Sequence, residues 1–250
     1  MERTIVFIYG VVAYVISLGT LLYAIGFIGN IAVPKSIDDG PEGPLVESLL
    51  VDAALLGLFA IQHSVMARQG FKKRWTQIVP RAAERSTYVL ISCLLLLLLF
   101  WQWRPMSETV WELDDPTAQI VLEALFWFGW LIAFRSSFLI DHFDLFGLRQ
   151  AYLYLRGEKY TPVRFKMPGL YQYVRHPLMM GFLIAFWATP VMTFSHFLFA
   201  LAMTIYIFIS IHLEERDLIK LYGQAYQEYR RRVPLILPLP RKGKSIEGGC

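Results

Sequence analysis

Cysteine and charge are both scarce in this chain, and each shortage excludes a class of protein. Only two of the 250 residues are cysteine, Cys93 and Cys250, which is too few for a disulfide framework or a cysteine-based metal site. Charged residues make up 18% of the chain and hydrophobic residues 56%, a composition that argues against a soluble domain. The net charge of +4 is typical of basic loops beside anionic lipid, so we expect no nucleic-acid partner.

Several short catalytic motifs are also missing. The sequence contains no HExxH and no paired-cysteine spacing, so we expect no metal site. It contains no phosphate-binding loop, no GxGxxG fingerprint and no GxSxG nucleophile elbow. Membrane enzymes, small transporters and accessory membrane factors remain as candidate classes.

Long apolar runs are what the chain has instead. A membrane-spanning helix needs about 20 mainly apolar residues, and we predict spans at residues 5–28, 45–67, 86–103 and 118–140. The first run is too long for a signal peptide and lacks a clear cleavage site, so we expect it to be retained. Two shorter runs, 177–191 and 196–213, would form a C-terminal helical hairpin that crosses the membrane fully or in part. The sequence thus predicts an all-α integral membrane protein, a single domain of residues 1–250 with five to six transmembrane helices.

The loops between these spans alternate in charge. Residues 34–44 and 108–115 are mainly acidic, whereas residues 68–85 and 141–175, which include Arg164, are mainly basic. Because basic loops stay on the inner side, we expect a multi-pass protein of the bacterial cytoplasmic membrane with both termini in the cytoplasm. Residues 148–155 read as a short interfacial helix. The tail from Glu214 has apolar residues at helical spacing and reads as an amphipathic helix on the membrane surface.

The predicted hairpin brings two polar clusters together. His176 and Glu214 each lie nineteen positions from Ser195, which falls in the predicted turn, residues 193–196. Two antiparallel helices that fold back there would place His176 and Glu214 at the same level, at the cytoplasmic mouth of the hairpin. Polar groups also lie at the cytoplasmic ends of the second and fourth spans: His63, Arg135, Asp141 and His142. Because such groups usually face a bundle interior or cavity, we predict one cytoplasmic-side pocket, which argues against a transporter.

Each member of this predicted pocket also has a structural interpretation. Arg175 and His176 precede Pro177, which suits the first turn of a helix, so they form either a carboxylate site or a membrane-entry cap. Gly181 allows close approach of either a ligand or another helix. Glu214 and Glu215 are poorly placed for the helix dipole, so they face either a cationic ligand or local arginines such as Arg175 and Arg230. Aromatic side chains nearby would form an adenosine wall or interface anchors: Tyr222, Tyr226 and Tyr229.

Two stretches carry a resemblance to known enzymes. RHPLMMG (175–181), followed by LEERDLIKLYGQAYQEYRRRVP (213–234), resembles the isoprenylcysteine carboxyl methyltransferase superfamily, which includes phospholipid methyltransferases. Met179 stands where that pattern usually has tyrosine, and Tyr222 where it has phenylalanine. Motifs along nearly the whole chain look like those of the bacterial methanethiol S-methyltransferases: QHSVMAR (62–68), ERSTYVL (84–90), FWQWRP (100–105), FLIDHFDLFGLRQ (138–150) and TPVRFKMPGLYQYVRHP (161–177).

The resemblance implies methyl transfer from S-adenosylmethionine to methanethiol, with dimethyl sulfide as product. It places the cofactor within residues 161–234, its carboxylate end at Arg175, His176 and the following backbone, and its ammonium or ribose at Glu214 or Glu215. The remaining implied cofactor contacts are Tyr171, Pro177, Leu178, Gly181, Tyr222, Tyr226, Tyr229 and Arg230. Methylation of an isoprenylcysteine carboxylate or a phospholipid, or a non-enzymatic role linked to nitrogen-oxide metabolism, are the alternatives.

A thiol substrate needs help to ionise, because the thiolate is the nucleophile. The candidate bases are His63 and His142, the latter poised by Asp141, whereas Arg135 would stabilise the thiolate instead. A lone intramembrane histidine is, equally, a common hydrogen-bonding group between helices. An apolar pocket from the second and fourth spans would suit methanethiol, and its neutral product could leave through lipid.

Overall fold

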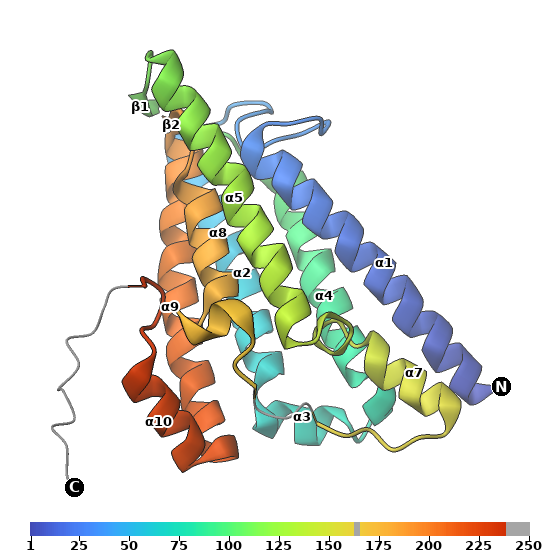
Figure 1. Cartoon of the computed structure of the whole chain (residues 1–250). Coiled ribbons are helices and arrows are strands. Elements are labelled where there is room, and N and C mark those ends of the chain that lie inside the picture. Colours follow the sequence, from blue (N-terminus) through green and yellow to red (C-terminus); the bar gives the residue numbers. More distant parts are fainter. Residues whose placement is uncertain (163–165, 239–250) are drawn as a thin grey trace, which may run out of the picture.

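The computed structural model describes residues 1–162 and 166–238, so Arg164 and Cys250 lie outside the described part of the chain. Five helices in it are long and apolar enough to cross a membrane: α1 (Glu2–Gly29), α2 (Leu45–Ala67), α4 (Arg81–Gln102), α5 (Pro116–Ile140) and α9 (Phe194–Tyr222). They pack as one bundle, in which α1 leans away from the others toward the N-terminus (Figure 1). The predicted all-α, multi-pass membrane fold is confirmed.

The first arm of the predicted hairpin is shorter than expected. Helix α8 (Pro177–Trp187) has only 11 residues, about 16 Å. The chain then makes a tight turn, in which the Thr189 amide donates to the Trp187 carbonyl at 3.1 Å, and continues to β2 (Val191–Thr193). Strand β2 pairs antiparallel with β1 (Thr109–Glu112), a small ladder that local sequence did not reveal. Pro190 has no amide hydrogen and disfavours helix at the residue before it. The predicted arm of residues 177–191 and its turn at 193–196 were therefore wrong in their bounds.

The second arm is longer than expected. Helix α9 begins at Phe194, where the Thr193 side chain accepts a hydrogen bond from the His196 amide at 3.1 Å. It then continues past Leu213 to Tyr222, because the change from apolar to polar residues does not by itself end a helix. The break comes at Gly223, whose φ of 58° favours glycine. The predicted tail helix is therefore divided, and only α10 (Gln224–Arg232) is a separate amphipathic element.

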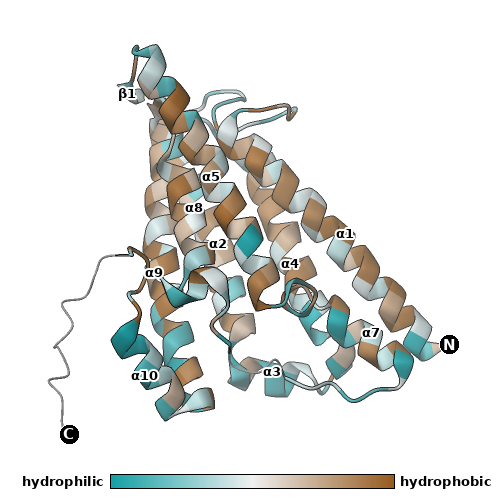
Figure 2. Cartoon of the chain, viewed as in Figure 1, coloured by the Kyte–Doolittle hydropathy of each residue, from teal (hydrophilic) through white to brown (hydrophobic). Residues whose placement is uncertain are grey.

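Short elements cover one end of the bundle. They are α3 (Gln69–Trp75), which was not predicted, α6 (His142–Leu145), α7 (Leu148–Arg156), the 3-10 turn η1 (Gly169–Gln172) and α10. Figure 1 places α3, α7 and α10 at the end where α1 begins and α9 finishes. Figure 2 shows hydrophilic residues gathered on these elements, below the mainly hydrophobic helices. The polar segments thus share one end of the molecule.

Helices α5 and α8 pack at very short range because glycines face each other. A Cβ atom on Gly181 would lie 2.5 Å from the carbonyl oxygen of Gly129 and 2.6 Å from the amide nitrogen of Ala133. A Cβ on Gly129 would in turn lie 2.6 Å from the amide nitrogen of Ala185. The sequence left open whether Gly181 allows close approach of a ligand or of another helix, and the structure shows close approach of helix α5.

Candidate active site

The two ends of the hairpin meet. Nδ1 of His176, at the start of α8, lies 3.9 Å from Oε2 of Glu214, near the end of α9. The level predicted from a symmetric turn is right although the turn is displaced, because the non-helical residues between α8 and α9 supply the length that α8 lacks. The segment that follows α10 packs against this point. The backbone amides of Arg175 and His176 donate hydrogen bonds to the carbonyls of Pro234 and Leu235, at 2.9 and 3.1 Å respectively.

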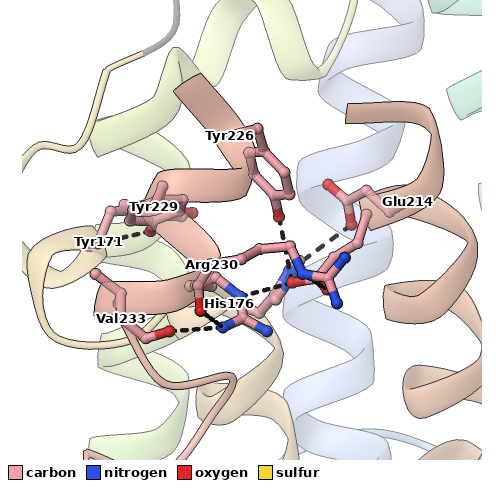
Figure 3. A network of polar contacts seen from close by, with 9 residues as sticks. Tyr171, His176, Glu214, Tyr226, Tyr229, Arg230 and Val233 are labelled. Carbon is pink, nitrogen blue, oxygen red and sulfur yellow. Dashed lines mark hydrogen bonds and ion pairs between the residues drawn. The ribbon is translucent and has the colours of Figure 1, made fainter. Parts of the chain in front are cut away.

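The Arg175 side chain is held in place by α9 and by the end of α10. Its Nε donates to Oε1 of Glu215 at 2.6 Å, and both residues are buried. Its Nη1 donates to the carbonyls of Val233 at 2.6 Å and Arg230 at 3.1 Å (Figure 3). Arg175 therefore joins the start of α8 to α9 and to the end of α10.

Glu215 is the centre of this network. Besides Arg175, its Oε1 lies 3.3 Å from Nε2 of His176 and accepts from the Tyr226 hydroxyl at 3.3 Å. Its Oε2 pairs with Nε of Arg230 at 3.1 Å. A buried carboxylate needs such pairing. The structure thus shows the second interpretation of Glu215, pairing with local arginines.

Glu214 has a different environment from its neighbour. Its side chain is 49% exposed and points toward His176 (Figure 3). Helix α8 begins beside it at Pro177, without a side-chain cap in the described structure, so the first-turn amides of Leu178 and Met179 have no acceptor within the helix. A carboxylate and a helix N-terminus therefore lie together, which is an arrangement that suits a ligand carrying an amine and an acid.

The tyrosines of this region pack against each other. The Tyr229 hydroxyl donates to the Tyr171 carbonyl at 2.6 Å, and its ring meets the Tyr226 ring at a centroid distance of 5.7 Å. Burial raises the pKa of Tyr229 to about 12 and raises the pKa of Tyr171 and Tyr226 as well, so all three are neutral phenols at physiological pH. Tyr222 packs at the edge of the same cluster. These side chains dock α10; the adjoining surface hollow, about 380 Å³, is lined by Ile219, Gln227, Arg230 and Arg231.

His63 lies inside the bundle among aromatic rings. Its Nε2 lies 2.7 Å from the Tyr88 hydroxyl and its Nδ1 lies 3.2 Å from Oγ of Ser92, both on α4. The rings of Phe59 and Tyr206 flank it at centroid distances of 5.3 and 6.3 Å. His63 is therefore a hydrogen-bonded group between α2 and α4 that also faces α9.

The fourth-span candidates are not assembled as predicted. His142 is buried, and its two ring nitrogens lie 2.9 Å from the hydroxyls of Tyr14 and Ser137. Asp141 instead accepts from the Asp144 amide at 3.1 Å, so hydroxyl groups, rather than Asp141, orient the His142 ring. Burial lowers the pKa of His142. Arg135 is exposed on the surface of α5.

Two residues near the site were missed by sequence reasoning. Tyr88 lies in the quoted motif ERSTYVL, but only the fold brings it to His63. Oγ of Ser210 is buried and has no hydrogen-bond partner among the residues that the structure describes. Ser210 stands one helical turn before Glu214 and one turn after Tyr206, and this i, i+4 spacing is the signal that would have found it.

Comparison with known proteins gives consistent results. The family model described as "NnrU protein" matches residues 51–234. The chain is 53% identical to the "Methanethiol S-methyltransferase" of Crocosphaera subtropica, over 95% of this chain and 93% of that protein. It is 49% identical to the protein of the same name from Mycobacterium tuberculosis, over 97% and 99% of the two chains. "Nurim" of Rattus norvegicus is 30% identical over 80% and 78%. No solved structure matches.

Proposed function

Because the chain belongs to the NnrU family, together with relatives named methanethiol S-methyltransferase, we propose that it methylates methanethiol, using S-adenosylmethionine, and so forms dimethyl sulfide. The observation that supports this proposal most strongly is sequence identity of 53% and 49% with two relatives of that name. Each alignment covers at least 93% of both chains. At that level a shared reaction is the simplest expectation.

The described residues fit the amino-acid end of the methyl donor. Glu214 would hold the ammonium, and the amides at the start of α8, with His176 beside them, would hold the carboxylate. The Ser210 oxygen, one turn before Glu214 on α9 and without a hydrogen-bond partner among the described residues, offers a polar contact to what lies beyond the ammonium. Arg175 and Glu215 support this site indirectly, because their ion pair fixes the start of α8 against α9.

The chemistry requires little from the protein besides position and a dry site. The bound donor supplies a methyl group already activated on a sulfonium. The helices must align the thiol sulfur behind that methyl carbon, since an in-line displacement depends on orientation. Around His63, residues of α2, α4 and α9 would supply an aromatic surface for a small thiol: Phe59, Tyr88 and Tyr206. A neutral methylated product can then leave through the lipid.

We place this site on the cytoplasmic side of the bacterial inner membrane, with both termini on that side. The basic loops support this orientation, because α3, α7 and α10 carry Lys and Arg and lie at the same end as the site (Figures 1 and 2). A water-soluble methyl donor is also available only from the cytoplasm.

The test uses the full chain purified in detergent, with methanethiol, S-adenosylmethionine carrying a labelled methyl group, and headspace gas chromatography. We expect labelled dimethyl sulfide with the native chain and with Glu158→Gln, a change at an exposed surface carboxylate. We expect little with Glu214→Gln. Label in the lipid fraction, with none in the gas phase, would favour the lipid-methylating alternative; no label in either would contradict methyl transfer.

A further inference from the structure

We propose that Tyr88 and His63 form a proton relay that ionises the thiol, in which the Tyr88 oxygen takes the thiol proton while Tyr88 passes its own proton to His63. The inference rests on the proposed thiol methylation and adds the residue that would contact the substrate. It begins from the 2.7 Å contact between the Tyr88 hydroxyl and Nε2 of His63.

The hydrogen bonds around Ser92 support one direction for this contact. The Ser92 hydroxyl has one hydrogen, and the shortest of its contacts to an acceptor is the one to the carbonyl of Tyr88, at 2.9 Å. The relay assigns the hydrogen to that carbonyl, so that Ser92 accepts from Nδ1 of His63 at 3.2 Å. In the neutral ring Nε2 is then an acceptor, and the Tyr88 hydroxyl donates to it. Nε2 of His63 can therefore receive a proton, and the proton comes from the Tyr88 hydroxyl.

The Tyr88 oxygen can still accept a hydrogen bond while it donates one to His63. A phenol oxygen that donates one hydrogen bond keeps its lone pairs for another donor, and a thiol S–H is such a donor. The Arg85 guanidinium lies 4.9 Å from the centre of the Tyr88 ring, where its charge favours negative charge developing on the ring oxygen. Arg85 is itself held in place, because its Nε donates to the Leu145 carbonyl at 2.8 Å.

Helix α9 connects this pair to the proposed donor site. Tyr206, Ser210 and Glu214 stand on successive turns of α9, so Tyr206 and Glu214 are about 12 Å apart along the helix. Tyr206 contacts His63 at one end of this row, and Glu214 faces His176 at the other. The charged and titratable groups in electrostatic range of Tyr88 are Arg85 on α4, Arg68 after α2, and Tyr206 and Glu214 on α9. Tyr88 reaches this row through His63, so a thiol beside Tyr88 would lie at its Tyr206 end, and a donor held at Glu214 would extend toward it along α9.

The step balances in atoms and charge. The thiol S–H bond breaks and its proton forms a bond to the Tyr88 oxygen, while the Tyr88 O–H proton moves to Nε2 of His63. His63 becomes an imidazolium that donates from Nδ1 to Ser92. The thiolate electron pair forms the new S–C bond to the methyl carbon, and the electron pair of the broken S–C bond stays on the donor sulfur. His63 later returns its proton to Tyr88, which releases one to water.

The experiment measures methyl transfer to methanethiol against pH, at saturating donor, for the purified full chain and its variants. Tyr88→Phe removes the proton-accepting oxygen, and His63→Gln removes the final acceptor while keeping a polar side chain. Loss of a general base costs about 10²- to 10⁴-fold, so we expect both variants to be at least about 100-fold slower near neutral pH. Their rates should rise about tenfold per pH unit below the pKa of the thiol, because only spontaneously formed thiolate reacts.

Tyr9→Phe is the matched control, because it removes a tyrosine hydroxyl that donates to Thr87, the neighbour of Tyr88 on α4. It should keep the pH profile of the native chain. An aryl thiol, already ionised near neutral pH, should react almost equally with the native chain and Tyr88→Phe. An equal loss at every pH and with both thiols would mean that Tyr88 is structural, and would overturn the relay alone. A native chain that methylates no thiol would overturn the proposed function and the relay with it.

Discussion

The buried carboxylate of Glu215 is expected to hold α10 onto the bundle, and Glu215→Ala tests this directly. The side chain pairs with Arg175, His176 and Arg230 and accepts from Tyr226. Without it, the Arg175 guanidinium stays buried against α9 with no counter-charge. The variant should therefore release α10, which begins only nine residues after Glu215 but contacts α8 through this network.

The size of the effect follows from the burial of the partners. Removing one member of a buried ion pair costs about 3–5 kcal/mol. Arg230 is 43% exposed, so its pairing contributes little and we take the lower end, about 3 kcal/mol. Because about 1.4 kcal/mol corresponds to tenfold, the population with α10 released should rise roughly 100-fold.

Trypsin provides the assay, because α10 ends in three consecutive arginines, Arg230, Arg231 and Arg232. Cleavage at these residues tracks the released population when opening is fast relative to cutting, so its rate should rise roughly 100-fold in Glu215→Ala. Glu228→Ala is the control, since that exposed carboxylate bonds only Gln224 on the same helix in the described contacts. It should change the rate less than about threefold. An unchanged cleavage rate in Glu215→Ala would refute the role given to this network.

Three further predictions concern the donor site, the helix contact and the tyrosine cluster. Glu214→Gln should weaken binding of S-adenosylmethionine at least tenfold by calorimetry while leaving trypsin resistance unchanged, because Glu214 is exposed and Glu215 holds the fold; native affinity would exclude Glu214 from the site. Gly181→Ala should lower the midpoint of thermal unfolding by forcing α5 and α8 apart, at a cost of about 1–3 kcal/mol, whereas Gly57→Ala, with open space around its Cβ, should not; equal midpoints would contradict the packing. Burial raises the pKa of Tyr229 to about 12, so its contribution to stability should be full below about pH 10 and be lost between about pH 10 and 12, as the unfolded chain ionises first. Circular dichroism should therefore show a smaller loss of stability over that range in Tyr229→Phe than in the native chain, and an identical loss would contradict the shift.

The spans were predictable because hydrophobic length is a local property of the sequence. Helix α2 has the predicted bounds, Leu45–Ala67, since Pro44 precedes it and Arg68 follows the apolar run. The end of α8 was not predictable, because it depends on a distant segment: β2 exists because β1 lies beside it. The start of α9 is different, since the Thr193 cap is a local contact to the His196 amide and threonine is a favoured cap residue. Local sequence therefore contained the second signal and not the first.

The site shows the same division between local and distant information. The spacing around Ser195 correctly placed His176 beside Glu214, but adjacent residues on a helix point about 100° apart. Sequence could not tell which of the two acids is buried with Arg175; the structure assigns that position to Glu215 and leaves Glu214 exposed. The partner of His63 is 25 residues away on another helix, so Tyr88 could be found only after folding.

The position of the bound methyl donor decides whether His176 and Glu214 form the site. Ultraviolet cross-linking of S-adenosylmethionine, labelled on its methyl group, to the full chain, followed by mass spectrometry of the labelled peptides, measures this directly. We predict label at the start of α8 or between Tyr206 and Glu215 of α9, and its loss in Glu214→Gln. Saturable label confined to other segments, such as α1 or α7, with an unchanged amount in Glu214→Gln, would contradict the site.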